Sequence, residues 1–82
     1  MMSMQYPVLK VNAVGERIRR QRIKCGLKVR DVADFMGFES EQAVYKWQRG
    51  DALPTVENLY ALSRLFGVSV DYILEGERGD ER

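Results

Sequence analysis

Histidine is absent from the 82 residues of this chain, and cysteine occurs once, as Cys25. The chain therefore lacks the commonest general base and most transition-metal ligands, so we expect no metal site and no cofactor. Neither a Ser/His nor a Cys/His catalytic pair can be assembled, which makes an enzyme the least favoured class of function. A single thiol also excludes a disulfide within the chain and favours a cytoplasmic location.

Long hydrophobic runs are lacking as well. No apolar stretch approaches the ~20 residues of a membrane span. The opening residues, MMSMQYPVLKV, have neither the basic start nor the apolar centre of a signal peptide, so we expect no membrane association. Hydrophobic residues make up 45% of the chain, which is enough for one small core and excludes wholesale disorder.

The net charge is only +1, but the charges are unevenly distributed. Residues 1–30 hold eight basic side chains against Glu16 alone, whereas residues 31–82 hold five basic and eleven acidic ones. This asymmetry indicates one basic and one acidic side of the domain. Taken alone, the basic cluster can also be a solvated helix face.

Hydrophobic periodicity predicts five short helices, and therefore a compact all-α domain over residues 12–75. An N-terminal arm of residues 1–11 precedes it, and a charged flexible tail of residues 76–82 follows it. The arm packs on the domain or on a second subunit, or it is disordered.

The first predicted helix begins at Asn12, a good N-cap, and ends at Gly26, a residue type that commonly follows helices. Its core stripe is expected to consist of Val14, Ile18 and Cys25. Gln21 interrupts that stripe where an apolar residue would be expected.

The last two predicted helices have clear boundaries. Thr55 is the expected N-cap of a helix that ends at Gly67, and Ser69 is the expected N-cap of the helix after it. Their expected core residues are Leu59, Leu62, Leu65 or Phe66, Val70, Ile73 and Leu74. Tyr72 and the segment 66–70 are candidates for a dimer surface, or simply belong to the core.

Residues 29–50 carry the most functional information, because their pattern predicts two helices joined by a turn. The first covers residues 29–36 and buries Val32, Ala33 and one or both of Phe35 and Met36, although Lys28 is a poor cap for it. The second follows Ser40, its expected N-cap, and stops before Gly50. In a helix-turn-helix, the second helix enters the DNA major groove.

Four residues are expected to give this unit its structure. Ala33 is small enough for close helix approach, and Gly37 can adopt the positive φ angle that ends a helix. Val44 and Trp47 share one face of the second helix, so we expect both in the core and not on the DNA.

The outer face of that second helix supplies the candidate base contacts, which are Glu41, Gln42, Ala43, Tyr45 and Lys46. The Gln42 amide suits the N6/N7 edge of adenine, with an exposed glutamine as the alternative. Ala43 contacts a thymine methyl or is simply a small helix former. Glu41 accepts from a cytosine amino group or, the preferred interpretation, is an acidic first-turn residue favoured by the helix dipole. Lys46 can meet a phosphate or a guanine.

The candidate phosphate contacts surround this helix. Arg49 lies in its exit and contacts a phosphate or is simply a solvated loop residue. Thr55 opens the fourth helix, whose free backbone N–H groups offer an anion site. Asn58 adds a side-chain donor there. Arg17, on the first helix, can reach a flanking phosphate or only steer the encounter.

The order of these segments resembles the lambda-repressor-like helix-turn-helix family, also called the Cro or XRE type. Residues 14–76 match it nearly end to end through VGERIRRQRIKCGL, the Ala33–Gly37 spacing, AVYKWQRG, LPTVENLYALSRLFGVS and DYILEG. The resemblance implies sequence-specific binding of double-stranded DNA, usually by a homodimer, and a repressor-like role in transcription regulation.

Three departures from the family pattern stand out. The turn GFES is one residue longer than usual, which can tilt the recognition helix. Val29 replaces a family glutamine that touches a phosphate, which leaves Lys28 as the candidate for that contact. Gln48 replaces an acidic residue that pairs with an arginine at position 22, so Arg22 can be hydrogen-bonded but not ion-paired there.

A second function is a protein-interaction module on the same scaffold, such as an antitoxin or antirepressor with a protein partner. Glu39, Glu41 and the modest net charge favour it slightly. Selection of a DNA motif from a random library distinguishes the two.

Overall fold

Five α-helices make up the part of the chain that the structure, a computed structural model, describes, which is Tyr6 and residues 8–76. The helices are α1 (Val11–Lys24), α2 (Val29–Met36), α3 (Gln42–Arg49), α4 (Val56–Phe66) and α5 (Val70–Glu75). The predicted all-α, five-helix fold is confirmed. Of the predicted arm and tail, residues 1–5, 7 and 77–82 lie outside the described residues.

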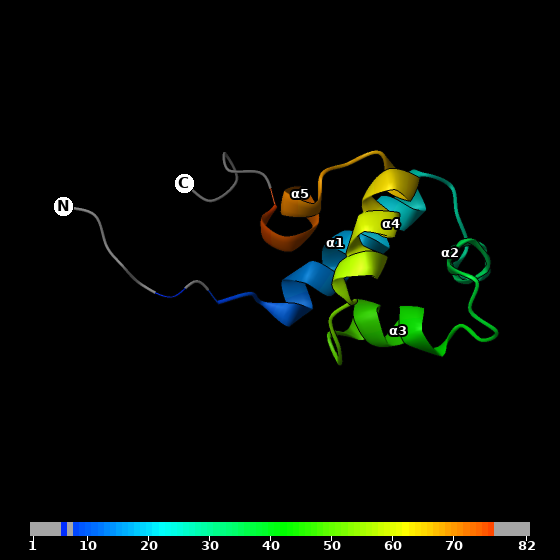
Figure 1. Ribbon diagram of the computed structural model, residues 1–82, viewed down its shortest axis with the longest axis horizontal. Coiled ribbons are helices and arrows are strands. Elements are labelled where there is room, and N and C mark those ends of the chain that lie inside the picture. Colours follow the sequence, from blue (N-terminus) through cyan, green and yellow to red (C-terminus); the bar gives the residue numbers. More distant parts are fainter. Residues whose placement is uncertain (1–5, 7, 77–82) are drawn as a thin grey trace.

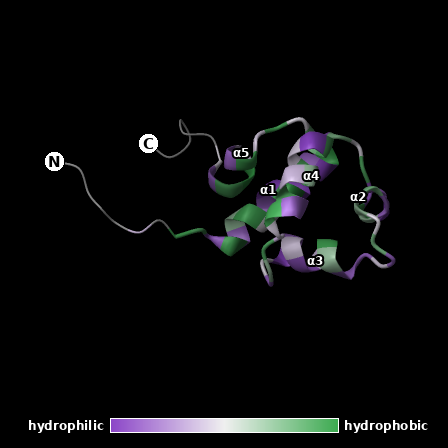
Figure 2. Cartoon of the chain, viewed as in Figure 1, coloured by the Kyte–Doolittle hydropathy of each residue, from purple (hydrophilic) through white to green (hydrophobic). Residues whose placement is uncertain are grey.

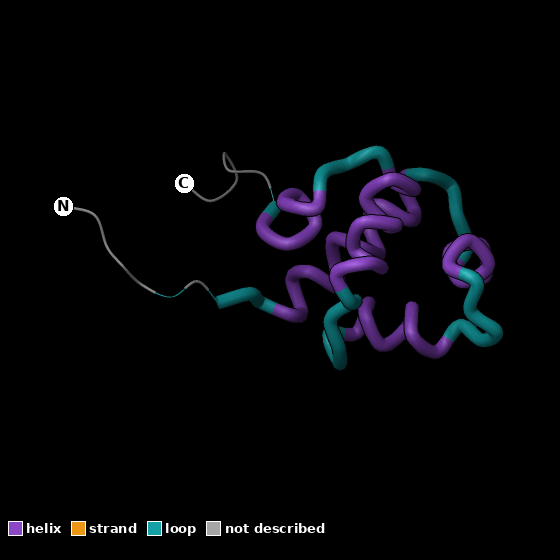
Figure 3. Tube along the Cα trace, in the orientation of Figure 1, coloured by secondary structure: helices purple, strands orange, loops and turns teal. Residues whose placement is uncertain are grey.

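The helices pack around α1 without forming a parallel bundle (Figure 1). α1 contacts α3 and α5, α2 contacts α3, and α4 contacts α5. Figure 3 shows that short loops join successive helices, with α2 and α5 toward opposite ends of the helical part. Hydrophobic and hydrophilic residues alternate around the helices, as expected for short helices that share one core (Figure 2).

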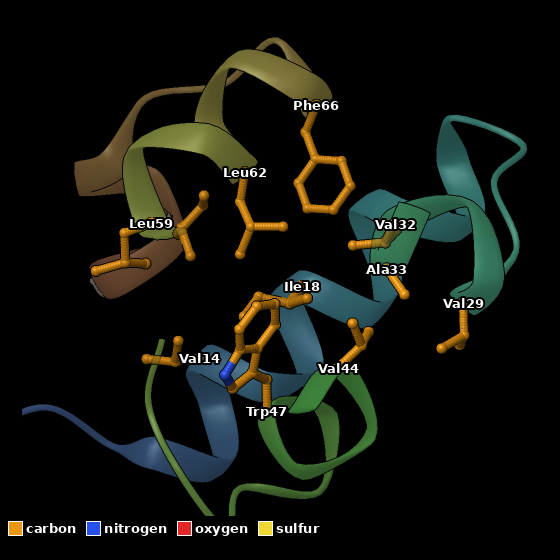
Figure 4. Packing of buried hydrophobic residues seen from close by; sticks show 11 residues of the cluster. Val14, Ile18, Val29, Val32, Ala33, Val44, Trp47, Leu59, Leu62 and Phe66 are labelled. Atoms are coloured by element: carbon orange, nitrogen blue, oxygen red, sulfur yellow. The ribbon is translucent and has the colours of Figure 1, made fainter. Parts of the chain in front are cut away.

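All five helices contribute to a single hydrophobic core. Ile18, Leu62 and Ile73 have no exposed surface and come from α1, α4 and α5. Figure 4 shows that Trp47 and Val44 of α3 point toward this cluster from below. The burial of Val44 and Trp47 therefore determines which face of α3 points into the core.

The first helix differs from the prediction at its start. It begins at Val11 with Lys10 in the N-cap position, and no side chain caps it. Asn12 therefore lies inside the helix, where its Oδ1 faces Gly50 at the end of α3. Gly26 follows the helix with a φ of 72°, as predicted.

Gln21 of α1 and Cys25, which directly follows that helix, exchange their expected environments. Cys25 is exposed, because the helix ends at Lys24 and the 3.6-residue period does not extend to the thiol. Gln21 is buried instead, with 7% of its surface exposed, and its Nε2 donates to the Tyr72 hydroxyl at 3.4 Å. A buried amide is tolerated because it has this partner.

The predicted N-caps of α4 and α5 are confirmed. Thr55 Oγ1 accepts from the Asn58 N–H at 3.2 Å, and Ser69 Oγ accepts from the Tyr72 N–H at 2.9 Å. Each hydroxyl satisfies a backbone donor that the first turn of a helix leaves free.

Candidate nucleic-acid interface

The turn between α2 and α3 is built as predicted around Gly37, whose φ is 80°. The Gly37 N–H donates to Asp34 O at 3.0 Å and the Phe38 N–H donates to Ala33 O at 2.9 Å, a pattern that ends many helices. The Phe38 ring then packs edge-on against Trp47, with ring centroids 5.8 Å apart. The aromatic contact anchors the turn to α3.

The start of α3 differs from the prediction. Glu41, not Ser40, occupies the N-cap position, and its side chain makes no cap hydrogen bond. Ser40 Oγ accepts only a long hydrogen bond, of 3.4 Å, from the Gln42 N–H. Ser40 therefore lies one position before the N-cap.

The two faces of α3 separate as the sequence predicts. Val44 has no exposed surface and Trp47 has 5%, so both are core residues. Gln42, Tyr45 and Lys46 are exposed, and Ala43 is half-buried. The structure therefore places three of the five candidate base contacts on the exposed face of α3, while Ala43 packs partly against the core.

The fifth candidate, Glu41, faces α2. Its Oε2 lies 3.8 Å from Nη1 of Arg30, and a third of its side chain is exposed. This ion pair offsets the charge of a carboxylate at the start of α3.

The exit from α3 carries three candidate phosphate contacts. Arg49 is exposed and pairs with Asp51 at 3.0 Å, and both side chains remain more than half exposed. A short loop then leads to Thr55 and the first turn of α4, where Asn58 is half-buried (Figure 3). The other candidates lie on different helices.

Lys28 and Arg17 stand in different surroundings. Lys28 is an exposed residue at the start of α2, and its N–H donates to Asp31 Oδ2 at 2.8 Å. Arg17 is half-buried, and its Nε and Nη2 donate to the carbonyl oxygens of Ile73 and Leu74 at 2.9 and 2.8 Å. The structure thus holds Arg17 on the last turn of α5 and not beside α3.

A close contact between α1 and α3 was missed by the sequence reasoning. A Cβ at Gly15 would lie 2.8 Å from the Gln48 carbonyl oxygen and would also collide with that of Trp47. A glycine inside a helical pattern was the available signal, since such a glycine often marks a close approach. Nearby, Arg22 Nε donates to Gln48 Oε1 at 2.8 Å, which confirms the predicted hydrogen bond.

No helix in the described part of the chain has the length and apolar character needed to cross a membrane. Among the same residues, no three His, Cys, Asp or Glu side chains are grouped so that they could hold a metal ion. An open pocket of about 710 Å³ lies between residues 8–10, α1 and α5, and its lining includes Arg17 but none of the α3 candidates.

Comparison with known proteins adds independent findings. A helix-turn-helix family model matches residues 18–73. Repressor protein C2 of Salmonella phage P22 is 35% identical over 69 residues, which are 84% of this chain and 32% of that protein. The HTH-type transcriptional regulator DicA of Escherichia coli is 39% identical over 64 residues, 78% of this chain and 47% of the regulator. The chain thus spans from 32% to 47% of the length of these relatives.

Solved structures give the same picture. The P22 c2 repressor in complex with a synthetic operator has a TM-score of 0.73 and 38% identity, and the match covers 78% of this chain and 96% of that one. The DNA-binding domain of BldD from S. venezulae has a TM-score of 0.66 and 27% identity, and the match covers 79% of this chain and 96% of that domain.

Proposed function

The chain belongs to the lambda-repressor-like helix-turn-helix family, and we propose that it binds double-stranded DNA sequence-specifically and regulates transcription as a repressor does. One observation carries the proposal: the fold matches, at 38% identity and nearly the whole length of the other chain, a repressor whose structure includes its operator. The relatives named as repressors and regulators support the same function. They give no support to the antitoxin or antirepressor alternative.

The shape of α3 suits the major groove. The helix has 8 residues, and an α-helix with its side chains is ~10–12 Å in diameter. The major groove is ~12 Å wide and admits one helix. Because Val44 and Trp47 fix the inner face of α3, Gln42, Tyr45 and Lys46 are presented outward together.

We assign the base contacts to this outer face. The Gln42 amide can donate to and accept from adenine, a contact that discriminates against other bases by about 1–3 kcal/mol. The part of Ala43 that the core leaves exposed is assigned to a thymine methyl, and Tyr45 and Lys46 are assigned further contacts along the groove. Glu41 can accept a hydrogen bond from a cytosine amino group only if its carboxylate breaks the ion pair with Arg30.

The phosphate contacts are assigned to residues at helix ends. Thr55 and the backbone N–H groups that follow it form an anion site, with Asn58 beside it. Arg49 can exchange its exposed partner Asp51 for a phosphate, because exposed ion pairs contribute only about 0–1 kcal/mol. Lys28 supplies a cation at the start of α2.

A two-fold operator fits these assignments. We propose that the chain acts in the cytoplasm as a homodimer, with half-sites about one helical turn, or ~34–36 Å, apart. Tyr72 and residues 66–70 are the proposed dimer contacts, although Phe66 is largely buried within its own domain.

Selection from a random duplex DNA library at two salt concentrations tests the proposal. We expect a palindromic motif to be enriched at both concentrations. Weak binding that disappears at the higher salt concentration, without any enriched motif, would leave only the sequence-independent electrostatic attraction and would refute sequence reading.

A further inference from the structure

Arg30 connects the three parts of the helix-turn-helix. Within α2, its Nε donates to Asp34 Oδ1 at 3.0 Å. In the turn, its Nη2 donates to the Phe38 carbonyl oxygen at 3.2 Å. At the N-cap of α3, its Nη1 lies 3.8 Å from Glu41 Oε2. One side chain thus contacts the helix before the turn, the turn itself and the start of the next helix.

We propose that Arg30 is a positioning residue that sets the orientation of α3 relative to α2 and thereby the base preference of the α3 surface. The inference rests on the proposed DNA binding and adds a determinant of its specificity. Arg30 itself is not assigned a base or a phosphate.

The need for such a residue comes from the lengthened turn. The Phe38 N–H donates a hydrogen bond to the Ala33 carbonyl oxygen of α2, but the Gln42 N–H donates only to Ser40 Oγ, at 3.4 Å. No side chain caps α3 at Glu41. The Phe38–Trp47 ring contact holds the turn against α3, but the first turn of α3 has no capping side chain, and the contacts of Arg30 with Phe38 and Glu41 add a constraint there.

The chemistry of the guanidinium suits this role. Its donors are held in a rigid plane, so the two acceptors that it hydrogen-bonds, Asp34 Oδ1 and the Phe38 carbonyl oxygen, have fixed relative positions, and the Glu41 carboxylate is attracted by its charge at 3.8 Å. A lysine at position 30 would keep the charge but not this geometry. Readout of a base requires that a side chain be held within about 0.5 Å and 10–20° of its working position. A small change of the turn therefore affects Gln42, the residue directly after the N-cap.

The Arg30–Glu41 ion pair has a second consequence, which comes from the negative charge of Glu41. A carboxylate at the start of a DNA-reading helix is repelled by phosphates. With Arg30 beside it, Glu41 keeps its position as an anchor for the turn, and the local charge is reduced. We expect Arg30 and Glu41 to be coupled. Replacing both residues in one protein should therefore change base preference by less than the sum of the effects of replacing each one alone.

The first test uses the protein without DNA. Residual dipolar couplings measured by NMR report the angle between α2 and α3 in the parent, Arg30→Ala, Arg30→Lys and Asp34→Asn. We expect both Arg30 variants to change the angle. Asp34→Asn is the matched control, because it removes the ion pair within α2 and leaves the contacts with Phe38 and Glu41. An unchanged angle in Arg30→Ala would overturn the inference.

The second test repeats the library selection with the same variants. A well-placed contact discriminates between bases by roughly 5- to 150-fold, so we expect Arg30→Lys to reduce preference by about fivefold or more at the positions read by the start of α3. The slope of binding against salt should remain unchanged. An equal loss on all sequences, with the slope lowered by about one unit, would make Arg30 a phosphate contact and overturn its positioning role.

These outcomes separate the two proposals. A parent protein that selects no motif refutes the proposed function, whatever the angle measurements show. A parent that selects a motif equally well after Arg30→Ala refutes the inference alone.

Discussion

Replacing Trp47 with alanine should nearly abolish folding, although the residue lies on the proposed DNA-reading helix. Only 5% of its surface is exposed, and its ring packs against Phe38 of the turn. Removing such a side chain costs about 3–5 kcal/mol, because the lost burial is combined with the cavity left behind. The Phe38 ring also loses its partner, and aromatic pairs contribute about 0.5–1.5 kcal/mol beyond burial.

The loss is large compared with the total stability. A chain of 82 residues is expected to have a free energy of unfolding of roughly 4–12 kcal/mol. Each kcal/mol shifts the melting temperature of a domain this small by about 4–8 °C. We therefore expect Trp47→Ala to melt at least about 12 °C below the parent, or to be unfolded at room temperature.

Urea unfolding followed by far-ultraviolet circular dichroism measures this effect. Fluorescence is unsuitable because Trp47 is the only tryptophan. Tyr45→Ala is the matched control on the same helix, since Tyr45 is 43% exposed and should change stability by no more than about 0.5 kcal/mol. If Trp47→Ala unfolds within about 1 kcal/mol of the parent, the ring is not part of the core and the orientation argued for α3 is wrong.

Four further variants test other parts of the structure. Gln42→Ala should relax base preference at one operator position and leave non-specific binding nearly unchanged; an equal loss on all sequences would contradict base reading. Arg49→Ala should weaken binding on every sequence and lower the salt slope by about one unit, and an unchanged slope would remove it from the phosphate contacts. Arg17→Ala should lower stability by about 1–2 kcal/mol in urea unfolding with no change in salt slope, because its donors bind α5 carbonyls; a lower slope would support the predicted phosphate contact instead. Gly15→Ala should destabilise the domain despite a helix-propensity gain of about 1 kcal/mol, since the clash is with the backbone of α3. A more stable Gly15→Ala protein would show that α1 and α3 can separate at little cost.

Most helix boundaries could be predicted because they are determined locally. Gly37 ends α2 with a positive φ, and the hydroxyls of Thr55 and Ser69 cap the next helices. Such signals depend on residues within a few positions of one another. The five-helix order and the helix-turn-helix followed from them.

The errors arose where a distant segment decides the local outcome. Asn12 is a good N-cap in isolation, but it faces Gly50 and the helix begins before it. Gln21 is polar, yet Tyr72 from α5 supplies its hydrogen-bond partner and allows burial. Neither partner can be identified from periodicity, because each is more than 35 positions away in the printed sequence.

In the candidate site, too, some features follow from the local sequence pattern and others depend on how the chain folds around them. The outward positions of Gln42, Tyr45 and Lys46 follow from the 3.6-residue period once Val44 and Trp47 are buried. The location of Ser40 before the cap depends on how the longer turn folds. Ser40 lies one position before the N-cap, the position predicted for it. A shift of one position shows why single contacts are harder to predict than the exposed face of α3 as a whole.

The arginines of the basic first third explain why charge counting gave little information about this surface. Three of the five arginines are held within the domain: Arg17 donates to α5 carbonyls, Arg22 donates to Gln48 and to the Leu27 carbonyl in the loop after α1, and Arg30 holds the turn. A guanidinium held in this way adds to the electric field of the domain, but it releases no counterion unless it meets a phosphate. The excess of +7 in residues 1–30 therefore overstates the number of expected phosphate contacts. Because the position of each cation decides what it binds, a chain with a net charge of +1 can still present a DNA-binding face.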